Sequence, residues 1–265
     1  MKAPTLSVIV ANYNNEGYIR DCLDSILNQT YRDLEILICD DFSTDDSLIT
    51  LLEYEKQFPS IIKVISNDSN LGVAETRHLT ILQARGEYIS TLDSDDYYYD
   101  IQKLQREMAL VICYKKYTGK DIIGFSNIVL VQGDKTPITI RGNPKIIKEG
   151  QIIKEILTRS CMIPRDFVMK REVYFEVGGF DTDIPIYEDW DLKIRLANRC
   201  DFYFSKVNGT AYRRHGRGLS SAPASEHIEW MQRIFNKNLA LVCNADRECV
   251  RGQFKQFLSK LKENS

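Results

Sequence analysis

The sequence predicts an α/β fold with a mainly parallel central sheet covered by helices on both faces. In the first hundred residues, short apolar runs alternate four times with segments of helical periodicity, as in sheets built from strand–helix–strand units. Apolar runs without polar alternation are typical of strands buried on both faces. Three of the four runs end in polar, acidic or aromatic residues, and ligands bind beyond the carboxyl ends of the strands in such sheets.

The first two strand–helix pairs begin with apolar runs at residues 6–11 and 34–39. After the first run, apolar residues recur at helical spacing over residues 19–27. After the second run, polar residues 43–46 supply a helix start, and Pro59 marks the end of that helix. This order predicts parallel strands that are joined by crossover helices.

The third and fourth strands are expected at residues 61–65 and 88–92. Between them, residues 71–73 lead into a helix that ends at Gly86, a residue suited to the left-handed backbone at a helix C-terminus. Beyond residue 98 the expected elements are a helix at 99–114, strands at 121–131 and 135–140, a helix at 152–157, a strand at 164–169, helices at 171–177 and from Glu188, and helical structure after Pro223.

Composition limits the classes of function. The 265 residues suffice for one large α/β domain or two fused lobes, and a formal net charge of −2 gives no basis for a nucleic-acid partner. Seven scattered cysteines without a C-x-x-C pair, among them Cys22, Cys39 and Cys113 in apolar stretches, indicate buried thiols in a reducing compartment. The sequence begins without a signal-peptide core and lacks an apolar run of the ~20 residues that a membrane helix needs, so we expect a cytoplasmic protein.

Asp93, Asp95 and Asp96 follow the fourth apolar run within four positions. Three like charges at this spacing repel one another, and neither a helix nor a strand interior favours them. A divalent cation would neutralise the repulsion, because hard cations take oxygen ligands. For a D-x-D motif taken alone, a solvated acidic turn is the alternative interpretation.

The ends of the other strands carry groups that a parallel sheet would bring to the same edge. Tyr13 follows the first strand, and Asp40 and Asp41 follow the second. Each also has a structural alternative, since Tyr13 could pack at the rim of the sheet and the two acids could form a turn and a helix cap. Arg77, in the first turns of the third helix, is either a surface cation or a phosphate contact near a helix N-terminus.

These segments resemble the N-terminal half of the family 2 glycosyltransferases, which have the GT-A fold. The matching text is SVIV with NYN in residues 7–14, SILNQTY at 25–31, EILICDDFS at 35–43, NLGVA at 70–74, and GEYI at 86–89 before the acidic cluster. The likeness is strong over about residues 5–100 and extends more thinly to about residue 222. It implies a nucleotide-sugar-binding half at 1–115, an acceptor-binding half at 116–222 and a helical tail at 223–265.

The resemblance also implies roles for the residues at the sheet edge. Asp40 and the loop after the first strand would hold the nucleotide base, Asp93 would lie near the ribose, and Asp95 would bind the Mg²⁺ or Mn²⁺ that bridges the donor diphosphate. Tyr13 would stack on the base or pack beside it, and Arg77 would help to fix the nucleotide. The implied nucleotide-binding set in this half is Ala11, Tyr13, Asp40, Arg77, Asp93 and Ser94.

A second matching segment lies near residue 190. The text GGFD at 178–181 and EDWDL at 188–192 looks like the family's acceptor-site segment. By this resemblance Asp189 is the general base, and Glu188 is a supporting contact or a substitute for it. The structural alternative is helix capping, because acids in a first helical turn are stabilised by the helix dipole.

Residues 212–221 combine basic side chains, glycines and hydroxyls, which suits a mobile flap that closes over a diphosphate; a surface turn is the alternative. By resemblance, His215 is a further metal ligand or a diphosphate contact, and Arg213 and Ser220 are weaker candidates. After Pro223, apolar residues with interspersed lysines predict a basic amphipathic helix. This helix could contact an anionic membrane at the cell's inner face, pack on its own domain, or meet a partner subunit in an oligomer.

Three classes of function remain. The first is an inverting, metal-dependent transferase that moves a sugar from a nucleotide-diphosphate donor, foremost a UDP-sugar, to a hydroxyl of a saccharide or lipid-linked saccharide. Family analogy suggests bacterial surface polysaccharide synthesis. The second is a sugar nucleotidyltransferase, although the Gly-rich basic loop usual in that class is missing after the first strand. The third is a non-catalytic phospho-signalling module, for which the chain is about twice too long. A calcium loop is excluded, because Tyr98 stands where an EF-hand requires glycine.

Overall fold

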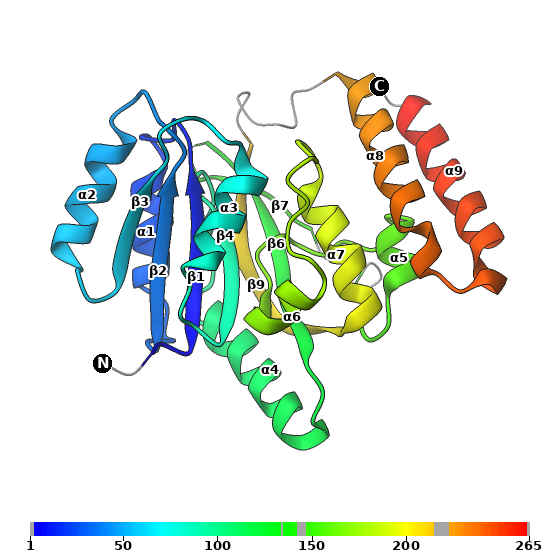
Figure 1. The fold of residues 1–265 in the computed structure, drawn as a ribbon, viewed down its shortest axis with the longest axis horizontal. Coiled ribbons are helices and arrows are strands. Elements are labelled where there is room, and N and C mark those ends of the chain that lie inside the picture. The colour runs from blue at the N-terminus through cyan, green and yellow to red at the C-terminus, as the bar shows by residue number, and fades with distance from the viewer. Residues whose placement is uncertain (1–2, 134, 142–146, 215–222, 264–265) are drawn as a thin grey trace.

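The computed structural model describes residues 3–133, 135–141, 147–214 and 223–263. Its strands are β1 Leu6–Asn12, β2 Leu34–Asp40, β3 Ile62–Ser66, β4 Tyr88–Asp93, β5 Tyr97–Tyr98, β6 Ile122–Gln132, β7 Pro137–Arg141, β8 Val168–Lys170 and β9 Asp201–Arg214. They form one mixed sheet in the order β3-β2-β1-β4-β8-β6-β9-β5, with β7 paired to β6 (Figure 1). The sheet and its helices give the α/β architecture that the sequence predicts.

The first four long strands form the parallel part of the sheet. β1 pairs in parallel with β2 and β4, and β2 pairs in parallel with β3. The register places Ala11 beside both Cys39 and Asp93, so the carboxyl ends of these strands lie at one edge. Val8 packs with α1 (Ile19–Leu27) and α2 (Ser47–Gln57), whereas Ile9 points to the opposite face and packs with α3 (Val73–Leu82). The expected parallel sheet over the first hundred residues is confirmed.

The second half of the sheet is mixed, and here the structure corrects several expectations. β8 is antiparallel to β4 and β6, and β9 is parallel to β6. β5 and β9 are not predicted by the sequence patterns. The pairing of β9 with β6 shifts register on either side of Asn127, and such bulges interrupt the alternation by which a strand is recognised. Its last residues, 212–214, belong to the strand although they were predicted to lie in a flap.

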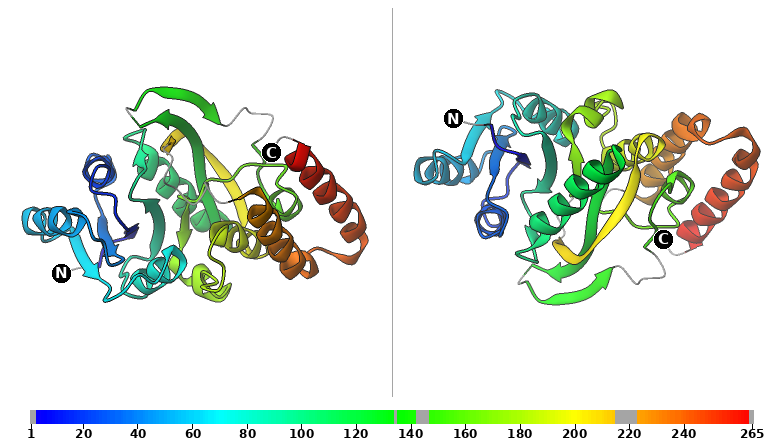
Figure 2. Two further views of the ribbon diagram at one scale, coloured as in Figure 1. Left: turned by 90° about the horizontal axis from the view of Figure 1, so that it is seen from above. Right: turned by 90° about the horizontal axis from the view of Figure 1, so that it is seen from below.

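Two other predicted elements have different bounds. The helix expected at 99–114 is α4 (Lys103–Thr118), which lies along β6 and β9 (Figure 2). It starts late because Tyr97 and Tyr98 pair with β9 as strand β5, and the Tyr99 N–H continues this pairing by donating to the carbonyl oxygen of Gly209. The strand expected at 164–169 is reduced to the three residues of β8.

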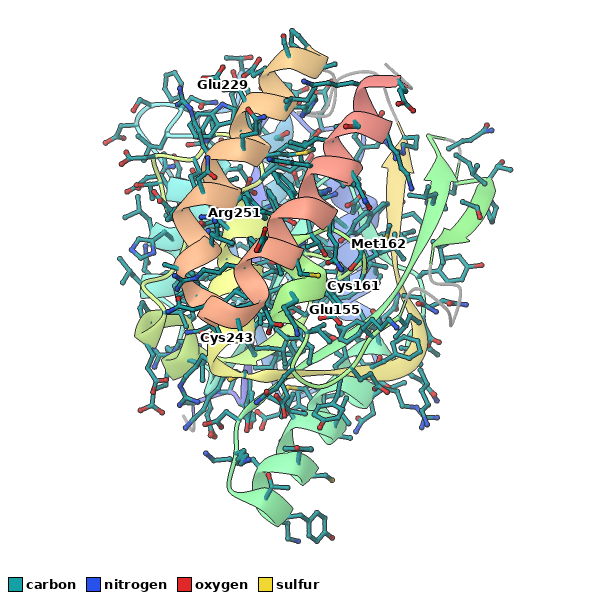
Figure 3. All side chains as sticks on the ribbon, turned by 90° about the vertical axis from the view of Figure 1, so that its right-hand side faces the viewer. Glu155, Cys161, Met162, Glu229, Cys243 and Arg251 are labelled. Carbon is teal, nitrogen blue, oxygen red and sulfur yellow. The ribbon has the colours of Figure 1, made fainter. Side chains whose placement is uncertain are left out.

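The remaining helices cover the far end of the sheet. They are α5 Ile153–Leu157, α6 Arg171–Glu176, α7 Glu188–Arg199, α8 Ala224–Asn238 and α9 Arg247–Glu263. α8 and α9 lie side by side over α5, as Figure 3 shows; Glu155 of α5 and Cys161, just after this helix, are labelled there. Phe254 of α9 stacks on Phe235 of α8 with ring centroids 4.0 Å apart, and Leu258 is buried as well. The apolar face of the C-terminal helix therefore packs on its own domain.

All seven cysteines are free thiols. Cys22 and Cys39 are buried as predicted, but Cys113 is exposed because it lies on the outer face of α4. None of the helices in the described ranges combines the length and the hydropathy that a membrane crossing requires.

Candidate active site

The acidic cluster lies where β4 ends. Asp93 is the last residue of β4, and one oxygen from each of Asp93, Asp95 and Asp96 lies within 4.8 Å of the others. Asp96 is buried, whereas Asp93 and Asp95 are partly exposed. Burial, together with the charges of the two neighbouring carboxylates, raises the pKa of Asp96 well above its usual range, while Arg165 acts in the opposite direction.

These three residues fit a divalent cation. They offer hard carboxylate oxygens at the spacing that a shared ion needs, and their mutual repulsion is the strain that a cation relieves. Asp95, between the other two acids in the turn after β4, is placed to supply a ligand together with either neighbour.

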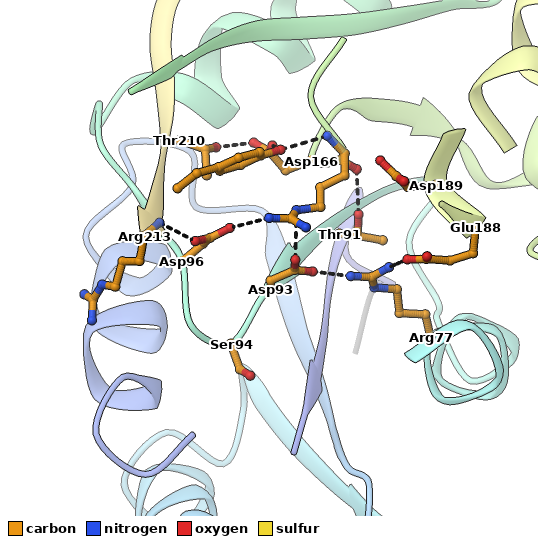
Figure 4. Close-up of polar contacts among 12 residues, drawn as sticks. Arg77, Thr91, Asp93, Ser94, Asp96, Asp166, Glu188, Asp189, Thr210 and Arg213 are labelled. Carbon is orange, nitrogen blue, oxygen red and sulfur yellow. Dashed lines mark hydrogen bonds and ion pairs between the residues drawn. The ribbon is translucent and has the colours of Figure 1, made fainter. Parts of the chain in front are cut away.

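Arg77 connects the acidic cluster to the second half of the chain. This buried side chain on α3 forms ion pairs with Asp93 and, through Nη1 at 2.6 Å, with Oε1 of Glu188 (Figure 4). Glu188 begins α7, so one guanidinium joins two acids that are 95 positions apart in sequence. Burial raises the pKa of Glu188, and the charge of Arg77 opposes this effect. Arg77 is therefore a buried, ion-paired residue and not a surface cation; its contact with the nucleotide stays a prediction.

Arg165 is a site residue that the sequence patterns do not reveal. Its Nε lies 2.8 Å from Oδ2 of Asp93, and its Nη2 lies 3.1 Å from Oδ2 of Asp96 (Figure 4). Its guanidinium also stacks on the ring of Tyr212, 4.4 Å from the centroid. The backbone is held on both sides, because the Arg165 N–H donates to the hydroxyl of Tyr212 and its carbonyl accepts from Thr91. The only signal for Arg165 in the sequence is a basic residue near the start of the strand that is predicted at 164–169.

Asp189 faces the same region from the N-terminal turn of α7. Lys193, one turn further along, contacts Oδ2 of Asp189 at 2.7 Å and also donates to the carbonyl of Ile163. Although burial acts to raise the pKa of Asp189, Lys193 and the nearby arginines lower it below its ordinary value. Asp189, Arg77 and Arg165 line one small cavity of about 10 Å³, together with Thr91, Phe167, Met169, Phe180 and Leu192.

The loops after β1 and β2 are locked together by Asp40. Its carboxylate accepts hydrogen bonds from the Asn12 amide at 2.8 Å and from the backbone N–H and hydroxyl of Ser43. Two aromatic side chains project from these joined loops: Tyr13 is 47% exposed and Phe42 is 52% exposed. Phe42, which has a left-handed backbone with φ of 65°, was not predicted as a site residue.

Ala11 and Ser94 lie beneath these loops. Ala11 is partly exposed beside Asp93 in the sheet. Ser94 is buried, and its hydroxyl accepts a hydrogen bond from the Asn15 amide at 2.8 Å. Both residues are thus at the predicted edge, and Ser94 connects the loop after β1 to the acidic cluster.

Arg213 has a structural environment that differs from the predicted flap. It lies in β9, its backbone N–H donates to Asp96 at 2.9 Å, and its guanidinium pairs with Asp21 at 2.5 Å between the rings of Tyr18 and Tyr97. His215 and Ser220, the other two candidates from this segment, lie outside the described residues.

Comparison with known proteins agrees with this geometry. The sequence profile of glycosyl transferase family 2 matches residues 7–174. A hyaluronan synthase of Pasteurella multocida is 40% identical over 226 residues, which are 83% of this chain; the chain spans only 21% of that synthase. The structure of Staphylococcus aureus TarS 1–349 in complex with UDP-GlcNAc has a TM-score of 0.69 at 21% identity, covering 94% of this chain and 71% of TarS.

A mannosyltransferase of Pyrobaculum calidifontis, solved with GDP-Man and Mn²⁺, has a TM-score of 0.65 at 16% identity, over 96% of this chain and 70% of that enzyme. These two structures cover nearly the whole chain, so the likeness in fold extends beyond residue 174, where the family profile ends. The sheet edge, the acidic cluster and the profile match lead to one assignment. The chain is a glycosyltransferase of family 2, and it has the GT-A fold.

Proposed function

We propose that this enzyme transfers a sugar from a nucleotide-diphosphate donor, foremost a UDP-sugar, to a hydroxyl of a saccharide or lipid-linked saccharide. The observation that supports this function best is the shared cavity, in which Asp189 faces Arg77 and Arg165, the two arginines that hold the acidic cluster. A donor bound at the cluster would thus present its sugar toward Asp189. The UDP-GlcNAc complex of TarS and the name of the hyaluronan synthase support a UDP-sugar and a role in polysaccharide synthesis.

Asp95, with Asp93 or Asp96, would hold Mn²⁺ or Mg²⁺ against the donor diphosphate. When bound, the ion would offset the negative charge that grows on the departing nucleotide diphosphate. Arg165 is the partly exposed cation beside this position, so it is placed to contact diphosphate oxygens once the acids have turned to the ion. His215 remains a proposed further ligand.

The nucleotide would lie over the joined loops of β1 and β2. Tyr13 and Phe42 offer exposed rings for stacking on the base, while Asp40 keeps the two loops in register. In this proposal Asp40 acts chiefly by positioning, because Asn12 and Ser43 already donate to its carboxylate.

Asp189 would take the proton of the acceptor hydroxyl as the new glycosidic bond forms. A positioned carboxylate typically contributes about 10²–10⁴-fold to such a step. Its lowered pKa keeps it ionised, and Lys193 stabilises that form. The same contact makes the carboxylate a weaker base, so its proton affinity would rise if the acceptor drew Lys193 away. In-line attack from this side gives inversion at the anomeric carbon, so the reaction needs no protein nucleophile at covalent distance.

The test is incubation of the purified chain with a panel of UDP-, GDP- and dTDP-sugars, with Mn²⁺, Mg²⁺ or EDTA, followed by mass spectrometry. Release of nucleoside diphosphate from one donor, dependent on the metal and lost with EDTA, is the expected result. Pyrophosphate-dependent exchange of the nucleotide would instead support a nucleotidyltransferase. Equal turnover with EDTA and Mn²⁺ would contradict the metal assignment.

A further inference from the structure

Arg159 stands where the backbone favours glycine. It follows Thr158, the C-cap of α5, and has a left-handed backbone with φ of 56°. Helices commonly end on a left-handed residue of this kind, and glycine is preferred there because it has no Cβ. Strained backbones of this sort cluster at ligand-binding and active sites. An arginine at this position suggests that its side chain is needed.

The side chain of Arg159 lies in an aromatic cage. Its Cζ is 5.1 Å from the ring centroids of both Tyr187 and Trp190, and 5.7 Å from that of Phe257. Within the described part of the chain, no carboxylate lies at ion-pair distance from it. Arg195, on the neighbouring helix α7, does have such a partner in Asp191. Arg159 is also partly exposed, so an anion from outside the chain can reach it.

The cage adjoins the proposed catalytic base. Tyr187 also has a left-handed backbone, with φ of 67°, and it is the N-cap residue immediately before Glu188 and Asp189. Desolvation by the cage lowers the pKa of Arg159, while the charges of Tyr187 and Asp189 act in the other direction. Arg159 is therefore close enough to Asp189 for the two charges to interact.

We propose that Arg159 binds an oxyanion of the acceptor and so selects acidic acceptors. The group recognised is a carboxylate, as in a hexuronic acid, or a phosphate, as in a polyol phosphate or a lipid-linked sugar. A guanidinium binds both in a two-pronged geometry, and the low dielectric of the aromatic cage strengthens the interaction. The inference deepens the proposed transferase function and rests on it, because it assigns the cage to the acceptor.

Trp190 provides a direct measurement. The chain has two tryptophans, so Trp230→Phe leaves Trp190, which contacts Arg159, as the single reporter of intrinsic fluorescence. In this background we would titrate methyl β-D-glucuronide, the neutral methyl β-D-glucoside and sn-glycerol 3-phosphate. We expect saturable fluorescence changes with at least one anionic probe, at least tenfold tighter than with the glucoside. The preference between glucuronide and glycerol phosphate then identifies the source of the oxyanion.

Substitution of the cation separates binding from packing. Arg159→Met should weaken the response to the anionic probe at least tenfold and leave the glucoside response unchanged, whereas Arg159→Lys should retain part of the anion preference. Arg20→Met is the matched control, since Arg20 lies over the ring of Tyr54 but already pairs with Glu53. If Arg159→Met does not fold, as judged by circular dichroism, Arg159→Gln takes its place.

The proposal would be overturned if the chain bound no anionic probe, or bound the charged and neutral probes with equal affinity. It would also be overturned if the response to the anionic probe were unchanged after loss of the Arg159 charge. UDP binding is measured on the same samples. Absence of UDP binding in the wild-type chain would count against the proposed donor, whereas normal UDP binding without anion discrimination would count against the role of Arg159 alone.

Discussion

The guanidinium of Arg165 lies between the carboxylates of Asp93 and Asp96, 2.8 Å from the first and 3.1 Å from the second. Asp95, the proposed metal ligand, lies between these two acids in sequence. A dication entering the cluster would therefore meet a positive charge that already offsets part of the negative charge of the acids. Metal binding and movement of Arg165 should be coupled, since like charges at such distances repel each other strongly at low dielectric.

Arg165→Met should tighten Mn²⁺ binding in the absence of nucleotide. The substitution removes the competing cation while Asp93 keeps its ion pair with Arg77, so we expect a gain on the order of tenfold, or ~1.4 kcal/mol. Electron paramagnetic resonance of free Mn²⁺ during titration gives the affinity, with Arg20→Met as the control. Weaker or unchanged Mn²⁺ binding would show that Arg165 does not compete with the ion.

Asp95→Asn should weaken Mn²⁺-dependent binding of UDP while leaving the fold intact. The amide keeps the size of the side chain but removes the charge that a hard cation prefers. Calorimetric titration of UDP with Mn²⁺ and with EDTA separates the metal-dependent part of the affinity. If the wild-type chain and Asp95→Asn bind UDP equally well in Mn²⁺, the ion is held elsewhere.

Asp189→Asn should retain donor binding but lower kcat by about 10²–10⁴-fold, the usual contribution of a positioned base. The amide cannot accept the acceptor proton, yet it still fits beside Lys193. Single-turnover kinetics at saturating donor measures the chemical step. Near wild-type turnover would move the role of base to Glu188, the adjacent acid.

Lys193→Met should shift the acidic limb of the pH–rate profile toward higher pH. Lys193 is the foremost favourable charge that lowers the pKa of Asp189, so its removal raises that pKa. Because the base must be deprotonated to act, kcat then begins to fall at a higher pH than in the wild type. A profile with an unchanged acidic limb would mean that Asp189 does not titrate in the rate-limiting step.

Stability should fall as the pH rises from about 4.5 to about 7, because of one buried acid. Burial raises the pKa of Glu107 from 4.5 to about 7, against the charge of Lys103 at 2.8 Å. The folded chain thus binds a proton that the unfolded chain has released across this range, and the free energy of unfolding declines with pH. Urea denaturation at pH 5 and pH 8 should show this decline, and Glu107→Gln should reduce it. An equal slope in the variant would contradict the assignment.

The parallel half of the fold was predictable because its signals are local. Buried strands such as residues 6–11 are nearly continuous apolar runs, and their ends carry the polar groups of the site. The roles of Asp95 and Asp189 follow from the family resemblance and remain predictions. The structure adds that the two regions lie close together. Arg77 joins Asp93 to Glu188, and Arg77, Arg165 and Asp189 line the same cavity.

The unpredicted features depend on long-range contacts. Arg165 becomes a site residue only because β8 places the loop before it next to β4, and Tyr212 supports its guanidinium from β9. Neither partner is near it in sequence. β9 is not predicted because its pairing with β6 shifts between Phe204 and Thr210, and these shifts break the two-residue period of the strand. Arg213 is assigned to a flap by the basic side chains, glycines and hydroxyls of residues 212–221, which outweigh the strand signal.

The strand pairings have a consequence for engineering this enzyme. β8 hydrogen-bonds to β4, and β9 to β5, so strands on either side of residue 115, the predicted boundary between the two halves, pair with each other in two places. A chimera joined at that residue would need matched backbone edges as well as compatible surfaces. If Arg159 selects the acceptor as proposed, exchange of acceptor preference is better attempted by grafting the two short segments around Arg159 and Tyr187 than by recombining whole halves.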